Sequence, residues 1–243
     1  MKDQYFGDKR DFFKYHLALT LVERLNLEAF TLVTMLTSPE GGNDGNQMDE
    51  RLHRLRPDLH DFLTDCVADE SKRRVASLRA YMEARHPDVR YVGYEDSQPM
   101  TSRTREGYFS RIQPFALHRA VILIDPDNGF EVQRSGEQHL LYSDFAQVFE
   151  AMDDESVLVA YQHRGRFETM RATFMKKAGG IVAAIPSARP FCISDNEIGF
   201  IIVTKSDELR GRVQSALGGF GLSKPCIFYG TESETMAAAS PQE

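Results

Sequence analysis

The chain has 243 residues, 42% of them hydrophobic and 27% charged, which is the balance of a globular protein that fits in one domain. Its formal net charge of −7 argues against a large nucleic-acid footprint, although a local group of Lys and Arg over 71–90 leaves room for a patch. The three cysteines are widely spaced and give no zinc or disulfide pattern, and no segment has the length and apolarity of a membrane span, so we expect a cytoplasmic protein without membrane contact.

The first quarter of the chain predicts a helix, a strand and a long loop. Apolar residues recur at helical spacing over 11–27, and Asp8 or Asp11 can cap the start of that helix. The apolar, Thr-rich run over 29–36 predicts a strand. The next segment, 37–50, holds three glycines, a proline and several acids, which fit no regular element.

The rest of the chain alternates between helical and strand patterns. The predicted helices are 48–69 with a break near Pro57, 70–86, a short one within 96–118, 142–152, 164–180 with a glycine stop, and 207–217. The predicted strands are 89–95, 119–125, 156–163, two around a polar turn within 190–206, and 225–230. The run over 119–125 is the clearest strand, because it is continuously apolar as a strand buried on both faces should be.

This order predicts an α/β fold, a Rossmann-like three-layer sandwich whose mostly parallel sheet carries an antiparallel hairpin at one edge. We expect one domain over 1–230, a helical insertion over 48–87, and a disordered tail over 231–243. Ligands of open α/β sheets bind outside the carboxyl ends of the strands. Three polar loops fall there, and they are 37–47, 125–131 and 162–166.

Two of the polar stretches near the N-terminus have competing interpretations. Asp8, Asp11 and Lys14 recur at spacings of three and share one helical face. They form either a helix cap with an exposed ion pair, or a cofactor pocket with Lys14 and Tyr15 at its entrance. The glycine-rich loop 38–46 is either a plain surface loop or a loop that faces the cofactor.

The stretch Asp125-Pro126-Asp127-Asn128-Gly129 follows the clearest strand and is the most informative of the chain. It is compatible with a simple turn. Alternatively, Asp125 and the Pro126 carbonyl accept hydrogen bonds from an amine, or Asp125 and Asp127 hold a divalent cation together with Glu131.

The loop after the next strand, Tyr161–Phe167, supplies His163, Arg164 and Arg166. The histidine is a candidate acid or base, and the arginines are candidate ligands for phosphate or carboxylate. A structural ion pair is an equally good interpretation of the two arginines.

The motifs resemble those of the 23S ribosomal RNA adenine-N6 methyltransferases. Gly7–Tyr15 resembles their opening Gly-Asn-x-x-Asp-x-x-Lys-His, Ile124–Asn128 resembles the strand end Ile-Asp-Pro-Pro-Tyr-Glu, and Gly199–Val203 resembles a late strand. The resemblance implies a class I S-adenosylmethionine-dependent methyltransferase fold that acts on an amino group, with nucleic acid as a possible partner. Two departures stand out: Thr37–Gly42 replaces the family's glycine-rich first loop, and Asp127-Asn128 replaces the Pro-Tyr whose ring stacks on the extruded base.

The resemblance and the loop positions together assign the following candidate roles. The catalytic candidates are Asp125, Pro126, Asn128 and His163; the cofactor-binding candidates are Asp8, Asp11, Lys14, Tyr15, Gly41, Gly42, Asn43 and Asp44; the substrate-binding candidates are Phe130, Arg164 and Arg166. Phe130 is the candidate replacement for the missing stacking ring.

Two other classes of function remain open at this point. One is a metal-dependent phosphodiesterase or nuclease, in which Asp125, Asp127 and Asp44 bind Mg²⁺ or Mn²⁺ and His163 assists a water molecule. The other is a non-catalytic binding module that has kept the fold.

Overall fold

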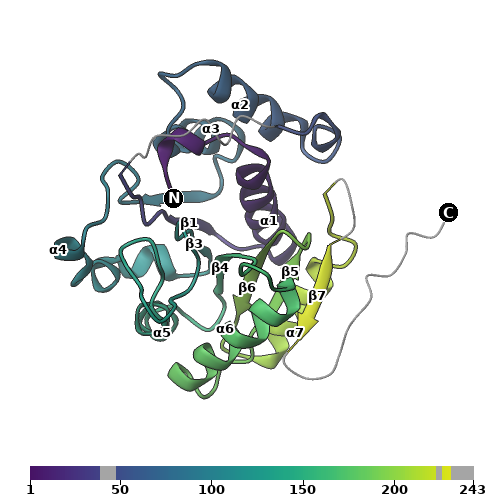
Figure 1. Cartoon of the computed structure of the whole chain (residues 1–243). Coiled ribbons are helices and arrows are strands. Elements are labelled where there is room, and N and C mark those ends of the chain that lie inside the picture. Colours follow the sequence, from purple (N-terminus) through teal and green to yellow (C-terminus); the bar gives the residue numbers. More distant parts are fainter. Residues whose placement is uncertain (39–47, 223–225, 231–243) are drawn as a thin grey trace.

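The computed structural model describes residues 1–38, 48–222 and 226–230, and these residues form an α/β fold around a seven-stranded sheet (Figure 1). The strand order is β2-β1-β3-β4-β6-β5-β7. The strands are β1 (Ala29–Val33), β2 (Arg90–Tyr94), β3 (Ala120–Ile124), β4 (Val157–His163), β5 (Phe191–Ser194), β6 (Ile198–Val203) and β7 (Ile227–Gly230).

The sheet has a parallel half and an antiparallel half. β1 pairs in parallel with β2 and β3, and β3 pairs in parallel with β4. β6 is antiparallel to β4 and to β5, and β7 is antiparallel to β5. The prediction of a mostly parallel sheet with a late antiparallel hairpin is therefore confirmed, except that β7 lies outside the hairpin and forms the edge.

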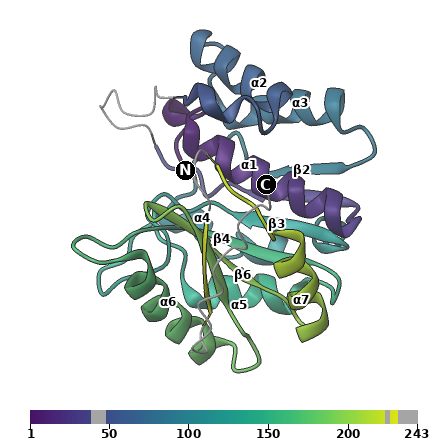
Figure 2. The ribbon, with the colours of Figure 1, turned by 90° about the vertical axis from the view of Figure 1, so that its right-hand side faces the viewer.

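Helices cover both faces of the sheet and give three layers (Figure 2). One face carries α1 (Lys9–Leu25), α2 (Pro57–Ala68), α3 (Leu78–Arg85) and α7 (Asp207–Ala216). The other face carries α5 (Tyr142–Ala151) and α6 (Met170–Ala184), with the short α4 (Ser102–Arg105) nearby. Short 3-10 turns complete the chain at η1 (Asp3–Tyr5), η2 (Glu50–Leu52), η3 (Val75–Ser77), η4 (Phe109–Arg111) and η5 (Pro114–Leu117).

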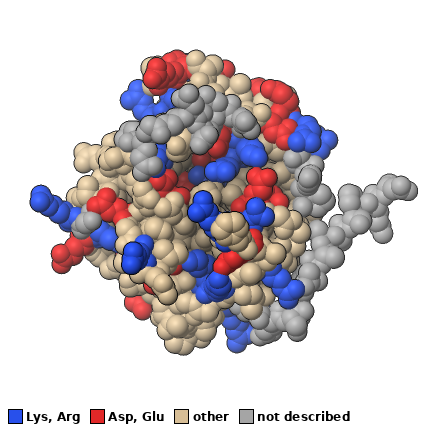
Figure 3. Space-filling view, viewed as in Figure 1, with Lys and Arg blue, Asp and Glu red and all other residues tan. Residues whose placement is uncertain are grey.

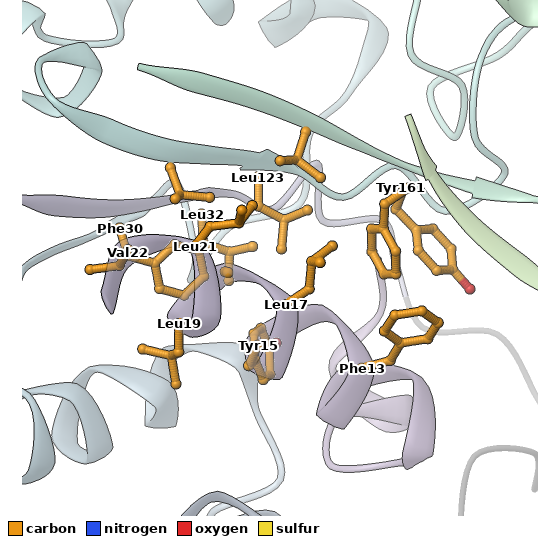
Figure 4. Packing of buried hydrophobic residues seen from close by; sticks show 14 of the residues in the cluster. Phe13, Tyr15, Leu17, Leu19, Leu21, Val22, Phe30, Leu32, Leu123 and Tyr161 are labelled. Carbon is orange, nitrogen blue, oxygen red and sulfur yellow. The ribbon is translucent and has the colours of Figure 1, made fainter. Parts of the chain in front are cut away.

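The central strands are buried on both faces because their sequences are continuously apolar. Every residue of β1 and of β3 is buried. On the α1 face, Leu17 and Leu21 point towards Leu32 and Leu123, and Phe13 lies beside Tyr161 (Figure 4). This packing fixes the start of α1 over the carboxyl ends of the parallel strands.

Two helix predictions need comment. The helices predicted over 48–87 form η2, α2, η3 and α3, which connect β1 to its parallel neighbour β2. The predicted glycine stop at 179–180 is wrong, because α6 continues to Ala184. Gly180 faces Tyr142 so closely that an added Cβ would lie 2.1 Å from the ring, so this glycine permits close packing of α5 and α6.

The other predicted helices and strands are found within a few residues of their expected bounds. No helix in the described part of the chain has both the length and the apolarity needed to cross a membrane. The expected tail, 231–243, lies outside the described residues.

Candidate functional site

The candidate site lies where the direction of chain progress across the sheet reverses. After β1 the chain forms β2 on one side, and then returns to form β3 on the other side of β1. Val33 pairs with Tyr94 and with Ile124, so the carboxyl ends of these three strands are level. Open α/β sheets bind their ligands at such a switch point.

The helix start beside this point is built by Gly7 and Asp8. The Asp8 carboxylate accepts hydrogen bonds from the backbone N–H groups of Arg10 (2.8 Å) and Asp11 (3.0 Å), so Asp8 is the helix cap. Gly7 has φ +100 and donates its N–H to Asp11 Oδ2 at 2.9 Å. A side chain at position 7 would press on Val67, so this motif requires glycine both for its backbone angle and for space.

Lys14 forms a buried three-charge cluster with two carboxylates. Its Nζ donates to Asp11 Oδ1 at 3.0 Å and to Asp125 Oδ2 at 2.8 Å, and it lies 4.6 Å from the centre of the Tyr161 ring. Lys14, Asp11 and Asp125 are only 6%, 2% and 1% exposed. The ion pair expected to be exposed is therefore buried, because the end of β3 covers this face of α1.

Burial and the neighbouring charges have opposite effects on the pKa values of Lys14 and Asp11. Burial alone would lower the pKa of Lys14, but the nearby Asp11 and Asp125 outweigh it and hold that pKa well above its usual range. Burial raises the pKa of Asp11 to about 6, against the pull of Lys14 and with a further contribution from Asp8. The cluster therefore combines a firmly protonated lysine with a carboxyl group that takes up a proton unusually easily.

The N-terminal residues lie in the crevice between the ends of β1 and β3. Lys2 Nζ is 3.2 Å from Asp127 Oδ2, and the Thr37 hydroxyl donates to the same oxygen at 2.9 Å. The Met1 amine donates to the backbone carbonyls of Met35 and Asp125. Burial alone would raise the pKa of Asp127, but the Met1 amine, Thr37 and Lys2 lower it below its usual range.

The Asn128-Gly129 turn is locked by Gln162 at the end of β4. The Gln162 side chain accepts a hydrogen bond from Phe130 N–H at 2.8 Å and donates one to the His163 carbonyl at 2.7 Å. Gly129 has φ +75, and an added Cβ would lie 2.5 Å from Gln162 Oε1. Asn128 donates to the Gln138 side chain at 2.6 Å, so it braces the turn. Gln162 lies within the stretch that we singled out by sequence, but its role was not predicted.

His163 is held between two protein groups. Its Nε2 is 3.1 Å from the Asp127 carbonyl, which can only accept, so this nitrogen carries the proton. Its Nδ1 is 3.5 Å from the Tyr161 hydroxyl. Burial, with the charges of Arg10 and Lys14, lowers the pKa of His163 to about 4. The ring is therefore neutral near pH 7 and connects the Asp127 turn to β4.

Two aromatic candidates lie in the core. Phe130 is fully buried, stacked on Tyr142 at 5.3 Å and edge-on to Phe145 at 5.1 Å, so it does not face a substrate. The Gly129 turn directs this ring inward, where burial of its apolar area is favourable. Tyr15 is fully buried as well, and its hydroxyl has no hydrogen-bond partner among the described residues. Tyr15 thus lies inside the protein instead of at an entrance.

The exposed aromatic residue at this end of the sheet is Phe167. Its side chain is 99% exposed, its φ is +63, and the Arg166 guanidinium lies 5.7 Å from the centre of its ring. Arg164 and Arg166 are exposed and form no ion pair with a described residue, so the structure does not show the structural ion pair that we considered. Figure 3 shows basic side chains around the middle of one face of the molecule, with acidic ones among them.

The remaining candidates concern the first loop and a metal. Gly41, Gly42, Asn43 and Asp44 lie outside the described residues, so their assignment to a cofactor stays a prediction. Within the described ranges, no group of three or more His, Cys, Asp or Glu side chains is placed to hold a metal ion. The metal alternative includes Asp44 and therefore also stays a prediction.

Two sets of oxygen acceptors near the strand ends lack partners. Asp125 Oδ1 and the Pro126 carbonyl accept no hydrogen bond from any described residue, although Asp125 Oδ2 is held by Lys14. Beyond β2, Asp96 Oδ2 is buried without a hydrogen bond, 4.0 Å from Arg79. Buried polar atoms without partners are uncommon and frequently mark a site for a ligand or water.

Neither the family models nor the curated proteins compared with this chain give a match, so the resemblance to the methyltransferases depends on the short motifs alone.

Proposed function

We propose that this protein is an S-adenosylmethionine-dependent methyltransferase that acts on the amino group of an unpaired nucleic-acid base. The observation that carries the proposal is a pair of acceptors at the switch point of the sheet, Asp125 Oδ1 and the Pro126 carbonyl, to which no described residue donates a hydrogen bond. An amino group presents two N–H donors, which match two acceptors on neighbouring residues.

The chemistry assigned to these residues is orientation and charge stabilisation. Lys14 fixes Asp125 Oδ2, so the free Oδ1 is held in one direction. As the amine nitrogen forms its new bond it gains positive charge, which the carboxylate of Asp125 stabilises. The locked turn at Gly129 and Gln162 keeps the Pro126 carbonyl in place during this step.

The carboxyl end of β2 carries polar groups that suit a nucleoside cofactor. In Rossmann-type folds an acidic side chain after the first loop accepts hydrogen bonds from ribose hydroxyls. Asp96 follows β2, and its Oδ2 and the Tyr91 hydroxyl are buried without a hydrogen-bond partner among the described residues. When bound, S-adenosylmethionine supplies the methyl group. These side chains would hold its polar groups.

The rim supplies contacts for a base and its phosphates. Phe167 takes over the stacking role that we had assigned to Phe130, because it is the ring that faces solvent. Stacking of a base on an aromatic ring contributes about 1–3 kcal/mol. Arg166 lies beside this ring and Arg164 is exposed on the same loop, and both can pair with phosphate oxygens.

Calorimetric titration with S-adenosylmethionine and S-adenosylhomocysteine tests the cofactor, and transfer of a labelled methyl group to single-stranded RNA and DNA tests the reaction. We expect Asp125→Asn to bind the cofactor normally and to transfer methyl groups about 10²–10³-fold more slowly. Asp207→Asn is the matched control, because it removes an exposed carboxylate whose partner is Arg189.

Wild-type protein that binds neither compound would overturn the proposal. Cleavage of labelled nucleic acid that requires Mn²⁺ and is lost in Asp127→Ala would support the metal-dependent alternative instead.

A further inference from the structure

A second polar pocket lies away from the crevice, between η2 and the first half of α2. It has a volume of about 620 Å³, and its lining is Glu50, His53, His60, Asp61, Thr64 and Asp65. None of the functional roles assigned above involves these residues. The pocket is therefore separate from the site of the proposed function.

His60 is the most unusual side chain of this pocket. Its side chain is 3% exposed, and neither ring nitrogen has a hydrogen-bond partner. Asp61 Oδ1 is 3.6 Å from its Nδ1, which is beyond hydrogen-bond distance. The rest of the ring packs edge-on against His53 and Phe12. A buried imidazole without partners indicates a ligand that offers polar groups.

The charge of the pocket is negative. Asp61 and Asp65 are one helical turn apart on α2, where like charges repel each other, and Glu50 adds a third carboxylate from η2. No lysine or arginine lines the pocket. Among the described residues, the closest nitrogen paired with Asp61 is His53 Nε2 at 3.3 Å, and neither Asp65 nor Glu50 forms an ion pair.

We propose that this pocket binds an organic polyamine. Three carboxylates favour a cation and disfavour an anion. The described residues place no three His, Cys, Asp or Glu side chains as metal ligands, so a bare metal ion does not suit the pocket. Ammonium groups donate hydrogen bonds to carboxylates and can also donate to an imidazole nitrogen that carries no proton, and His60 lines the pocket with two ring nitrogens that have no partner among the described residues.

The spacing of the acids favours several ammonium groups over one. Side chains at positions i and i+4 of a helix are about 5–6 Å apart at Cβ. A polyamine with short alkyl spacers can place one ammonium group at Asp61 and another at Asp65, with Glu50 closing the pocket from η2. Each ammonium group then offsets the repulsion between neighbouring carboxylates.

Titration of the full chain with spermidine at low ionic strength tests the proposal, with affinity measured by calorimetry. We expect saturable binding that Asp61→Asn and Asp65→Asn each weaken by at least about tenfold, because each removes a charge-assisted hydrogen bond. His60→Phe keeps the net charge and should also weaken binding. The same variant should unfold at an equal or higher denaturant concentration, because it removes two unpartnered nitrogens.

Asp207→Asn is the matched control, since it removes the same charge from an exposed site on α7. Spermidine binding that this variant weakens as much as Asp61→Asn does would show unspecific attraction to an acidic protein and would overturn the proposal. An absence of saturable binding would overturn it too, as would Mg²⁺ that displaces spermidine at matched ionic strength. An unchanged affinity in His60→Phe would contradict the assigned role of the imidazole.

Discussion

The charged side chains at the two ends of the parallel strands differ in their exposure to solvent. At the carboxyl ends, Lys14, Asp11 and Asp125 are nearly inaccessible to solvent. At the amino ends, Arg119 pairs with Glu28 at 2.8 Å and also with Glu155, and these two carboxylates are 52% and 59% exposed. At both ends, ion pairs join segments that are distant in sequence. The ion pairs at the carboxyl ends are buried, whereas those at the amino ends are exposed to solvent.

This difference indicates where function constrains the sequence. Exposed ion pairs cost little and contribute about 0–1 kcal/mol each. Buried charges pay a desolvation penalty, and apolar residues of similar volume frequently serve stability as well or better. A buried cluster of perturbed titratable groups in a crevice is therefore a marker of a functional site. Removing a charge from the buried cluster should therefore change stability far more than removing one from an exposed ion pair.

The largest effect is expected from Lys14→Met, which leaves Asp11 and Asp125 without their cation. We expect the free energy of unfolding to fall by about 3–5 kcal/mol in urea denaturation, because uncompensated buried charge remains. Lys9→Met is the control on the same helix, where the lysine pairs with the exposed Glu197 at 3.4 Å. Its loss should stay within about 0.5 kcal/mol. Equal losses in both variants would abolish the contrast between buried and exposed ion pairs.

The next effect concerns the turn that holds the free acceptors. Gly129→Ala forces a side chain into the left-handed region and against Gln162, so we expect a loss of about 1–3 kcal/mol. Gly136→Ala is the control, because an added Cβ there meets no atom within 4 Å. Thermal or urea unfolding of both variants measures these losses. An unchanged free energy of unfolding in Gly129→Ala would show that the turn is not rigid.

A smaller effect is expected from the pH dependence of stability. The pKa of His163 is about 4 in the folded chain against a usual value of 6.5, and His16 behaves alike because it is also buried. Between these values the unfolded chain binds more protons, so the free energy of unfolding falls as pH drops from about 6.5 to 4. Asp11, whose folded pKa is about 6, acts in the opposite direction over nearly the same range.

Unfolding measured at several pH values should therefore show a shallower loss for His163→Gln than for the wild type. His16→Gln should show a similar change, because each variant removes one histidine whose pKa is lower in the folded chain than in the unfolded chain. A pH profile of His163→Gln that matches the wild type would mean that His163 is more accessible to water than the structure shows.

The smallest effect is expected at the amino ends. Glu28→Gln removes one exposed partner of Arg119, which keeps Glu155. We expect a change below about 1 kcal/mol, decreasing further in high salt. A loss comparable to that of Lys14→Met would show that the exposed ion pairs at the amino ends matter as much for stability as the buried cluster at the carboxyl ends.

Much of the fold was predictable from the sequence because the signals are local. Continuously apolar runs identified β3 and β4, and the loops at their carboxyl ends were expected to gather polar side chains, as Asp125 and His163 do. Other features depend on contacts between distant segments. Helical spacing places Asp11 and Lys14 on one face, but only the fold shows that β3 covers it.

The aromatic residues make the same point. Phe130 and Phe167 both follow strand ends with similar flanking residues, and nothing in their local sequence separates them. Phe130 follows the positive φ of Gly129 and lies in the core, whereas Phe167 itself has a positive φ and its ring lies in solvent. Gly180 was misread for a related reason, since its role lies in contact with Tyr142 and not in its own helix propensity.

The separation of Lys14 from Asp125, 111 residues along the chain, has a consequence for the order in which the protein is made. A ribosome releases the whole of α1 long before it has synthesised the strand that carries the second carboxylate. Until then α1 can pack against β1 but not against β3, and the apolar residues that β3 will cover are open to incorrect partners. Contacts between such distant segments also slow folding. The docking of α1 is therefore complete only after β3 has emerged, and a chain truncated before β3 should require a chaperone to remain unaggregated.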